Sequence, residues 1–148
     1  MFDLPQASIV LLLVLTANAT PWVLAVLLGE RGNRPIHRRW LGNHKTWRGL
    51  LGGMLACGVV AALAGLGFAL GTAFGALALA GDMLASFVKR RLRLSPGTEV
   101  PGLDQLPEAV LPAWILAPRL GIAFAEIAAV ALTFMLLDLA TVRLRHRV

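Results

Sequence analysis

The feature that most constrains this chain is a run of about forty residues, 49–88, in which Asp82 is the single charged side chain. One membrane-spanning helix needs about 20 predominantly apolar residues, so a run of this length predicts a hairpin of two spans. Gly65-Leu66-Gly67, near its middle, is the expected turn. The rest of the chain must be compatible with two adjacent helices in lipid.

Glycines recur four residues apart on both sides of the expected turn. They are Gly49 and Gly53 in the first segment and Gly67, Gly71 and Gly75 in the second. Small residues at this spacing let helix backbones approach closely inside a membrane. The spacing therefore predicts that Lys45 and Arg48, at the start of the first helix, lie near residues 82–90 of the second.

The charged residues are few and clustered. Only 15% of the chain is charged and 57% is hydrophobic, whereas soluble domains carry about 25% charged residues. Thirteen of the fourteen Lys and Arg residues fall in three short runs, 31–48, 89–93 and 143–147, each beside an apolar segment. This placement is typical of cytoplasmic loops and argues against nucleic-acid binding despite the net charge of +6.

Three further apolar segments flank or follow these loops. Residues 4–28 form a first span, 107–120 a short one and 121–141 a last one. Ala17-Asn18-Ala19 resembles a signal-peptidase site, but the basic residues follow this segment rather than precede it, which favours a retained span with an outside N-terminus. The chain is thus expected to be an all-α integral membrane protein of the cell membrane. We expect one domain, 1–148, with about five transmembrane helices, an N-out/C-in orientation and cytoplasmic loops at 29–48 and 92–107.

The chemically informative stretch is 81–108. If residues 81–91 are helical, Asp82, Ser86, Lys89 and Arg90 lie on one face. An acid in an apolar segment is costly and indicates function, although Lys and Arg at a helix end also serve as headgroup anchors. Acids for a metal beside cations for phosphate are typical of phosphoryl or nucleotidyl transfer. Cys57 is a lone cysteine, so neither a disulfide nor a Cys-based metal site is expected.

Two blocks of the sequence resemble a known family. HKTWRGLLGG, residues 44–53, resembles the KTW-x-G-x-x-GG segment of the phosphatidate cytidylyltransferase superfamily. GDMLASFVKRR, residues 81–91, followed by PGLDQL, residues 101–106, resembles its GD-x-x-x-S-x-x-KR and Asp-Gln-Leu-Asp motifs as they occur in the CDP-archaeol synthase family. The short length of the chain is also similar to that of the CDP-archaeol synthase family, a smaller branch of this superfamily.

The resemblance implies a CTP-dependent cytidylyltransferase of phospholipid biosynthesis. Such an enzyme joins a membrane lipid phosphate to CTP, gives a CDP-lipid and pyrophosphate, and uses Mg²⁺. By resemblance, Asp82 and Asp104 would be metal-associated carboxylates and Lys89 a catalytic cation. The residues implied to hold the nucleotide and phosphates are Lys45, Thr46, Arg48, Ser86, Lys89 and Arg90. A homo-oligomer is compatible with this reading, and the lipid's tails and linkage stay open.

One departure from the family pattern concerns the second acid of the Asp-x-x-Asp pair. Position 107 is Pro, which suits the opening of a helix, and the nearest carboxylate is Glu108. We hypothesise that Glu108 replaces the missing acid as a metal ligand. Its alternative role is to interact favourably with the helix dipole in the first turn.

Two other functions remain open from the sequence. The missing carboxylate is compatible with a catalytically silent relative that binds lipid or assembles with another membrane protein. The acids Asp82, Glu126 and Asp138 are also compatible with a small transporter, although Glu126 and Asp138 could simply pair with Arg119 or Arg143. Magnesium-dependent release of pyrophosphate from CTP distinguishes the enzyme from both.

Overall fold

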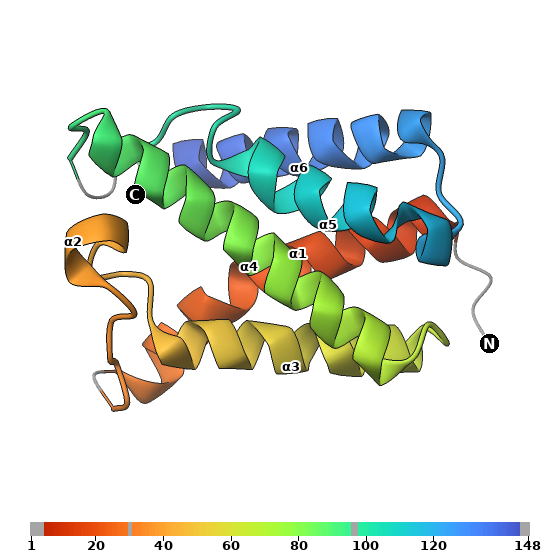
Figure 1. The fold of residues 1–148 in the computed structure, drawn as a ribbon, viewed down its shortest axis with the longest axis horizontal. Helices are drawn as coiled ribbons and strands as arrows, with labels where there is room; N and C mark the ends of the chain where they lie inside the picture. Colours follow the sequence, from red (N-terminus) through yellow and green to blue (C-terminus); the bar gives the residue numbers. More distant parts are fainter. Residues whose placement is uncertain (1–4, 30, 96–97, 146–148) are drawn as a thin grey trace.

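The computed structural model describes residues 5–29, 31–95 and 98–145, with side chains described up to Thr141. The basic tail, Arg143, Arg145 and Arg147, therefore lies outside the described side chains. The described part is helical apart from turns, loops and one isolated bridge between Pro35 and Thr46. Its helices are α1 (Gln6–Leu28), α2 (Arg38–Leu41), α3 (Trp47–Leu63), α4 (Phe68–Arg91), α5 (Gln105–Leu120) and α6 (Phe124–Arg145) (Figure 1).

The predicted hairpin is confirmed. α3 and α4 are joined by a turn in which Gly65 and Gly67 have φ angles of 81° and 89°, a region that favours glycine. Glycines also allow the two helices to touch, since a Cβ on Gly71 would stand 2.3 Å from the Cys57 carbonyl oxygen. A Cβ on Gly75 would stand 3.0 Å from the Met54 Cα. The spacing of small residues thus produced the close helix contact expected from it.

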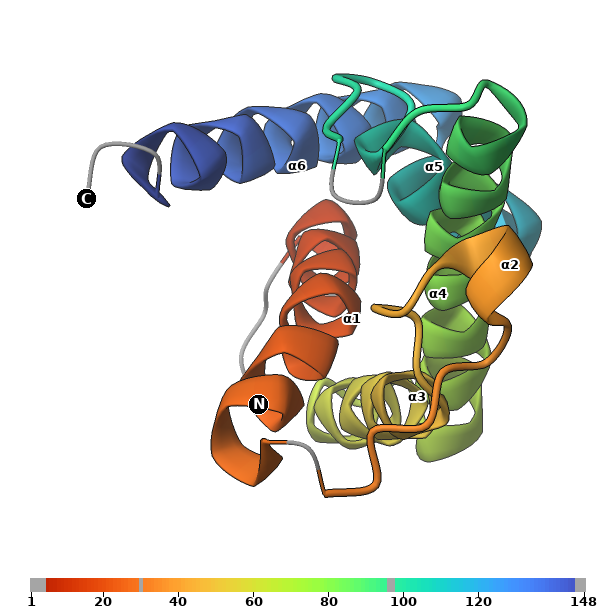
Figure 2. The same ribbon diagram turned by 90° about the vertical axis from the view of Figure 1, so that its left-hand side faces the viewer.

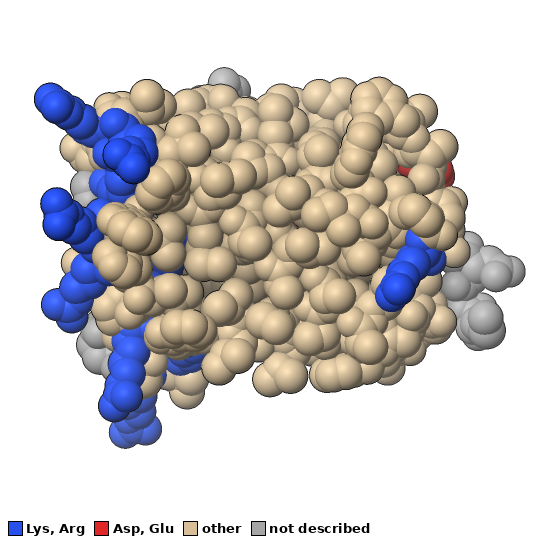
Figure 3. Space-filling model, viewed as in Figure 1, with Lys and Arg blue, Asp and Glu red and all other residues tan. Residues whose placement is uncertain are grey.

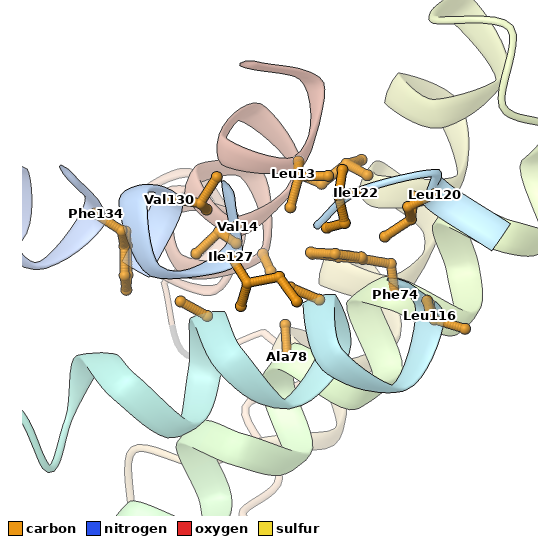
Figure 4. Packing of buried hydrophobic residues seen from close by; sticks show 14 of the residues in the cluster. Leu13, Val14, Phe74, Ala78, Leu116, Leu120, Ile122, Ile127, Val130 and Phe134 are labelled. Carbon is orange, nitrogen blue, oxygen red and sulfur yellow. The ribbon is translucent and has the colours of Figure 1, made fainter. Parts of the chain in front are cut away.

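α4 is the element against which the other helices are arranged. It crosses the molecule obliquely in Figure 1 and contacts α1, α2, α3 and α5. Buried apolar side chains of α1, α3, α4, α5 and α6 form one core together with Ile122 of the α5–α6 turn (Figure 4). Because α1 contributes Leu13 and Val14 to this core, both fully buried, it is part of the bundle.

The outer surface suits lipid over most of its length. Large apolar side chains face outward on several helices, for example Leu27, Leu63 and Phe124, which are 72%, 84% and 70% exposed. Figure 3 shows Lys and Arg gathered at the end where α2 and the last turns of α4 lie, beside a broad band almost free of charge. An apolar belt of this extent is typical of a surface that contacts a membrane.

Within the described residues, three helices are long and apolar enough to span a bilayer: α1, α4 and residues 124–141 of α6. α3 is a shorter apolar helix of 17 residues, and α5 has 16 residues. At 1.5 Å per residue, α5 is about 24 Å long, less than the hydrocarbon thickness of about 30 Å. The predicted short fourth segment is therefore present as a helix.

The loop at 29–48 contains a feature that the sequence pattern did not predict. Arg38–Leu41 form the single helical turn α2, which begins where the His37 Nδ1 atom accepts a hydrogen bond from the Trp40 N–H group at 3.3 Å. Trp40 meets the Phe87 ring of α4 edge-on. A helix of four residues is too short to show a hydrophobic period in the sequence, so the sequence could not predict α2.

Candidate active site

A cavity of about 590 Å³ lies at the basic end of the bundle. Its walls come from α1, the loop before α3, the second half of α4, the 98–105 turn and α6. Its polar lining includes Asn18, His44, Lys45, Asp82, Ser86, Lys89, Arg90, Thr98, Glu99, Asp104, Gln105 and Asp138. Figure 2, which looks at this end of the molecule, shows how α1, α4 and α6 surround the region.

The first ion pair in this cavity joins two separate blocks of the sequence. Lys45, just before α3, donates to a carboxylate oxygen of Asp82 on α4, and both side chains are about three-quarters buried. The contact exists because the glycine faces bring the start of α3 to the middle of α4. The predicted proximity of Lys45 to residues 82–90 is therefore confirmed.

The second ion pair closes the loop after α4 onto the helix. The Lys89 Nζ atom lies 2.6 Å from Asp104 Oδ1 and also donates to the Thr98 carbonyl oxygen at 3.0 Å. The other Asp104 oxygen accepts a hydrogen bond from the Val100 N–H group at 2.9 Å. The carboxylate of Asp104 is thus oriented by its own turn and by a cation from α4.

Ser86 and Arg90 complete the face of α4 that the spacing predicted. Both line the cavity with Asp82 and Lys89, and Ser86 is only 8% exposed. The Arg90 Nη2 atom donates to the Ser95 carbonyl oxygen at 2.8 Å, which holds the guanidinium near the loop. The structure therefore brings together six of the predicted site residues, namely Lys45, Asp82, Ser86, Lys89, Arg90 and Asp104.

Two of the predicted phosphate-binding residues, Thr46 and Arg48, lie outside the lining of this cavity and form hydrogen bonds to the backbone. Thr46 caps α3 by accepting a hydrogen bond from the Gly49 N–H group at 3.2 Å, and it lines a neighbouring cavity of about 50 Å³. The Arg48 Nη1 atom donates to the carbonyl oxygens of Gly29 and Arg31, which follow the end of α1. Arg48 is not among the residues that line either cavity, so the structure places it as a tie between α1 and α3.

Glu108 lies behind the cavity wall. It is 3% exposed, and one of its carboxylate oxygens accepts a hydrogen bond from Asn18 Nδ2 at 3.2 Å. Asp82 and Lys45 are among its charged neighbours. This proximity arises from Gly81, where an added Cβ would stand 2.2 Å from the Pro107 carbonyl oxygen. Close contact of α4 with α5 therefore places a third carboxylate near Asp82, but outside the cavity lining.

Two residues that line the cavity, Gln105 and Asp138, were not predicted as part of this site. The Gln105 Nε2 atom donates to Asp138 Oδ2 at 2.8 Å. Asp138 carried the same signal as Asp82, an acid in an apolar segment. Among the described side chains, which do not include that of Arg143, its hydrogen-bond partner is Gln105. Glu126 is at the opposite end of α6, where it accepts a hydrogen bond from the Ala123 N–H group at 2.7 Å.

The electrostatic arrangement suits a polyanion that carries a divalent cation. Lys45, Lys89 and Arg90 offer charge-assisted donors to phosphate oxygens. Asp82 and Asp104 offer carboxylate oxygens in the same space. In the described part of the chain, no group of three or more His, Cys, Asp or Glu side chains is arranged to hold a metal ion. Because Mg²⁺ usually binds through one or two carboxylates plus substrate phosphates, the donor set fits this ion.

Comparison with known proteins identifies relatives of this chain. The sequence model of the CarS-like CDP-archaeol synthase family matches residues 65–146. A CDP-archaeol synthase from Aeropyrum pernix is 44% identical over a stretch covering 68% of this chain and 63% of that protein. One from Hyperthermus butylicus is 38% identical, with 69% of this chain and 67% of that protein covered. The chain thus matches slightly less than two thirds of the Aeropyrum pernix protein.

A solved structure agrees with these matches. It is described as an intramembrane enzyme for archaeal membrane lipid biosynthesis, and 90% of each chain is covered at 36% identity with a TM-score of 0.72. The matched family segment includes α4, α5 and α6, and thus most of the cavity wall. On sequence, fold and the placement of the shared motifs, this chain belongs to the CDP-archaeol synthase family.

Proposed function

We propose that this protein transfers CMP from CTP to a membrane lipid phosphate. An oxygen of the lipid phosphate attacks the α-phosphorus of CTP, the bond to the β-phosphate breaks, and a CDP-lipid and pyrophosphate are formed. The observation that carries the proposal is the pair of lysine–carboxylate contacts, Lys45–Asp82 and Lys89–Asp104, in one cavity at the basic end of an apolar bundle. Family membership supports the same reaction.

The cationic residues would bind and orient the two anionic substrates. Lys45, Lys89 and Arg90 line the cavity from two sides, so they can neutralise the triphosphate and the lipid phosphate as these approach. Ser86, which is buried and lies on the same face of α4 as Lys89, would donate a hydrogen bond to a phosphate oxygen. Thr46 would contribute by holding the start of α3, and Arg48 by holding the adjoining loop.

We propose Mg²⁺ as the cofactor, held by Asp82 and Asp104 together with substrate phosphate oxygens. When bound, the ion would offset negative charge on the phosphates undergoing transfer and leaving. The lysines now paired with these carboxylates are close enough to exchange a carboxylate for a phosphate partner. The phosphates and the ion would take the places of the lost partners, so this exchange would leave neither the lysines nor the carboxylates unpaired.

One wall of the cavity supports a lipid as the second substrate. It consists of apolar residues from α1 and α6, including Trp22 and Val23, which are 55% and 39% exposed, and Leu137, which is 43% exposed. Hydrocarbon chains would gain free energy by contact with these side chains, while the phosphate reaches the cations. A water-soluble sugar phosphate would leave this wall in contact with water.

The test is an assay of purified protein with CTP, Mg²⁺ and a panel of lipid phosphates with ether-linked or ester-linked chains. We expect a CDP-lipid by mass spectrometry and one pyrophosphate per product. Pyrophosphate release without a CDP-lipid, or neither product with any lipid, would contradict the proposal and leave a lipid-binding or assembly role. The relative rates within the panel would identify the preferred chains.

For topology, we propose five spans, α1, α3, α4, α5 and α6, with an outside N-terminus and the cavity facing the cytoplasm of the cell. The basic loops beside α2 and α4 support this orientation. In a Cys57→Ala background, a membrane-impermeant maleimide should label Glu99→Cys from the cytoplasmic side alone. It should label Ala123→Cys, in the α5–α6 turn, from the outside alone. The reverse pattern would overturn the orientation.

We also propose that Glu108 contributes to metal binding in place of the acid missing at Pro107. Its proximity to Asp82 supports this role, although a metal would compete with the Asn18 contact. We expect Glu108→Gln to lower activity or raise the Mg²⁺ concentration needed for half-maximal rate, because an amide is a poor Mg²⁺ ligand. Glu126→Gln, at the other end of the bundle, should change neither.

Unchanged activity and Mg²⁺ dependence in Glu108→Gln would leave a site with two carboxylates. Since an amide oxygen can still accept the hydrogen bond from Asn18, this substitution separates metal binding from packing. If the wild-type protein is inert and Pro107→Asp creates activity, the protein is a silent relative.

A further inference from the structure

We propose that Asp138 of α6 acts through Gln105 as a positioning residue that fixes the orientation of Asp104 in the cavity. The proposal rests on the transfer reaction proposed above and adds α6 to its machinery. Along the sequence, α5, the turn after it and the first part of α6 lie between Asp104 and Asp138. Its position in the cavity wall requires an explanation, because a carboxylate in an apolar helix is costly.

Gln105 connects the turn before α5 to Asp138 through hydrogen bonds of its side-chain amide. Its side chain is buried, at 3% exposure, and both the oxygen and the nitrogen of its amide form hydrogen bonds. Oε1 accepts a hydrogen bond from the Gly102 N–H group at 2.9 Å, and Nε2 donates to Asp138 Oδ2 at 2.8 Å. A buried amide left without a partner would cost free energy. Asp138 thus determines in which orientation Gln105 is stable.

The same turn connects Gln105 to Asp104. Residues 100–106 form a compact turn in which the Asp104 N–H group donates to the Val100 carbonyl oxygen at 3.2 Å and Leu106 N–H donates to the Gly102 carbonyl oxygen at 2.9 Å. The Asp104 carboxylate accepts from Val100 N–H within the same turn. Anchoring Gly102 through Gln105 therefore anchors the backbone that aims Asp104 toward Lys89.

A misplacement of about 1 Å in a catalytic group can cost on the order of 10²-fold in rate. The bond from Gln105 to Asp138 ties the turn to α6, while Lys89 ties it to α4. Loss of the α6 tie would let the turn shift while the ion pair to α4 persists. The role requires a hydrogen-bond acceptor at position 138 rather than a negative charge.

The test compares Asp138→Leu with Asp138→Asn. The two side chains are similar in size, but only Asn keeps an oxygen that accepts from Gln105. We expect Asp138→Leu to lower kcat on the order of 10²-fold with little change in KM for CTP. Asp138→Asn should stay within about threefold of wild type, because the acceptor is retained. Glu126→Gln is the control for an acid in the same helix outside the cavity.

A second measurement does not depend on activity. Hydrogen–deuterium exchange of residues 98–106 in detergent, without substrates, should become faster in Asp138→Leu and stay unchanged in Asp138→Asn. Gln105→Met, which breaks the same bond from α5, should reproduce the exchange result if Asp138→Leu does not fold. An equal loss of activity in Asn and Leu would overturn the proposal and indicate a direct role of the charge.

Full activity or unchanged exchange in Asp138→Leu would also overturn the proposal. If the wild-type protein makes no CDP-lipid, the transfer reaction itself fails. The exchange measurement still decides whether Asp138 orders the turn, so the two failures are distinguishable.

Discussion

Asp82→Asn should reduce CDP-lipid formation by at least on the order of 10²-fold, the scale seen when one electrostatic contribution to transition-state stabilisation is removed. Asp82 is the carboxylate that α4 contributes to the cavity, and we propose it as a ligand of Mg²⁺. A neutral amide is a poor ligand for this ion. The measurement is the initial rate across a Mg²⁺ titration, with Glu126→Gln as the control.

The structure separates this catalytic role from a structural one. Asp82 also accepts a hydrogen bond from Lys45, and an amide oxygen at position 82 could still do so. The variant should therefore elute as a single species and unfold near the wild-type temperature. Full activity would contradict the metal role. A severe loss of stability with normal specific activity of the folded fraction would indicate that Asp82 serves mainly to pair Lys45.

Lys89→Ala should lower kcat/KM on the order of 10²-fold. Lys89 contacts the Asp104 carboxylate and the Thr98 carbonyl oxygen, and its side chain is only 13% exposed. Its removal takes away a cation for the phosphates and also releases the loop after α4. The rate should be measured at varied CTP and varied lipid phosphate, since loss of a phosphate contact formed equally in the ground state would appear in KM.

Arg91→Ala is the matched control for Lys89→Ala. Arg91 is the next but one cation on the same helix, but its side chain is exposed and lies over the Phe87 ring, 5.4 Å from the centroid. It does not line the cavity. We expect nearly wild-type kinetics in this variant. An equal loss in both would show that the basic cluster acts through net charge rather than through the placement of Lys89.

The sequence was most informative about features that depend on short stretches of the chain. The uncharged length of 49–88 required two helices, and the glycines required them to touch, because a membrane leaves few other ways to satisfy the backbone or to pack it. The face of α4 that carries Asp82, Ser86, Lys89 and Arg90 follows from helical period. Membership in the family was already indicated by short motifs in the correct order.

The partners of these side chains were decided by the tertiary structure. A helical period places Asp82 and Lys89 on one face, but it does not show that each pairs with a residue from another segment, Lys45 and Asp104. Similarly, Arg48 and Thr46 carry the chemistry of phosphate binding, and only their contacts show that they hold α1 and cap α3. Asp138 reaches the site because α6 returns beside α5, and its contact with Gln105 is long-range, so the helical period could not predict it.

The sequence by itself therefore determined the class of fold, the basic end and the cavity face of α4, because hydrophobic length, glycine spacing and helical period are short-range properties. The tertiary structure decided which carboxylates share the cavity. Glu108 lies one position from the expected acid but points behind the wall toward Asn18, whereas Asp138 lines the cavity from another helix. The physical reason is that helix rotation and crossing depend on packing contacts such as Gly81 against Pro107, which only the folded chain contains.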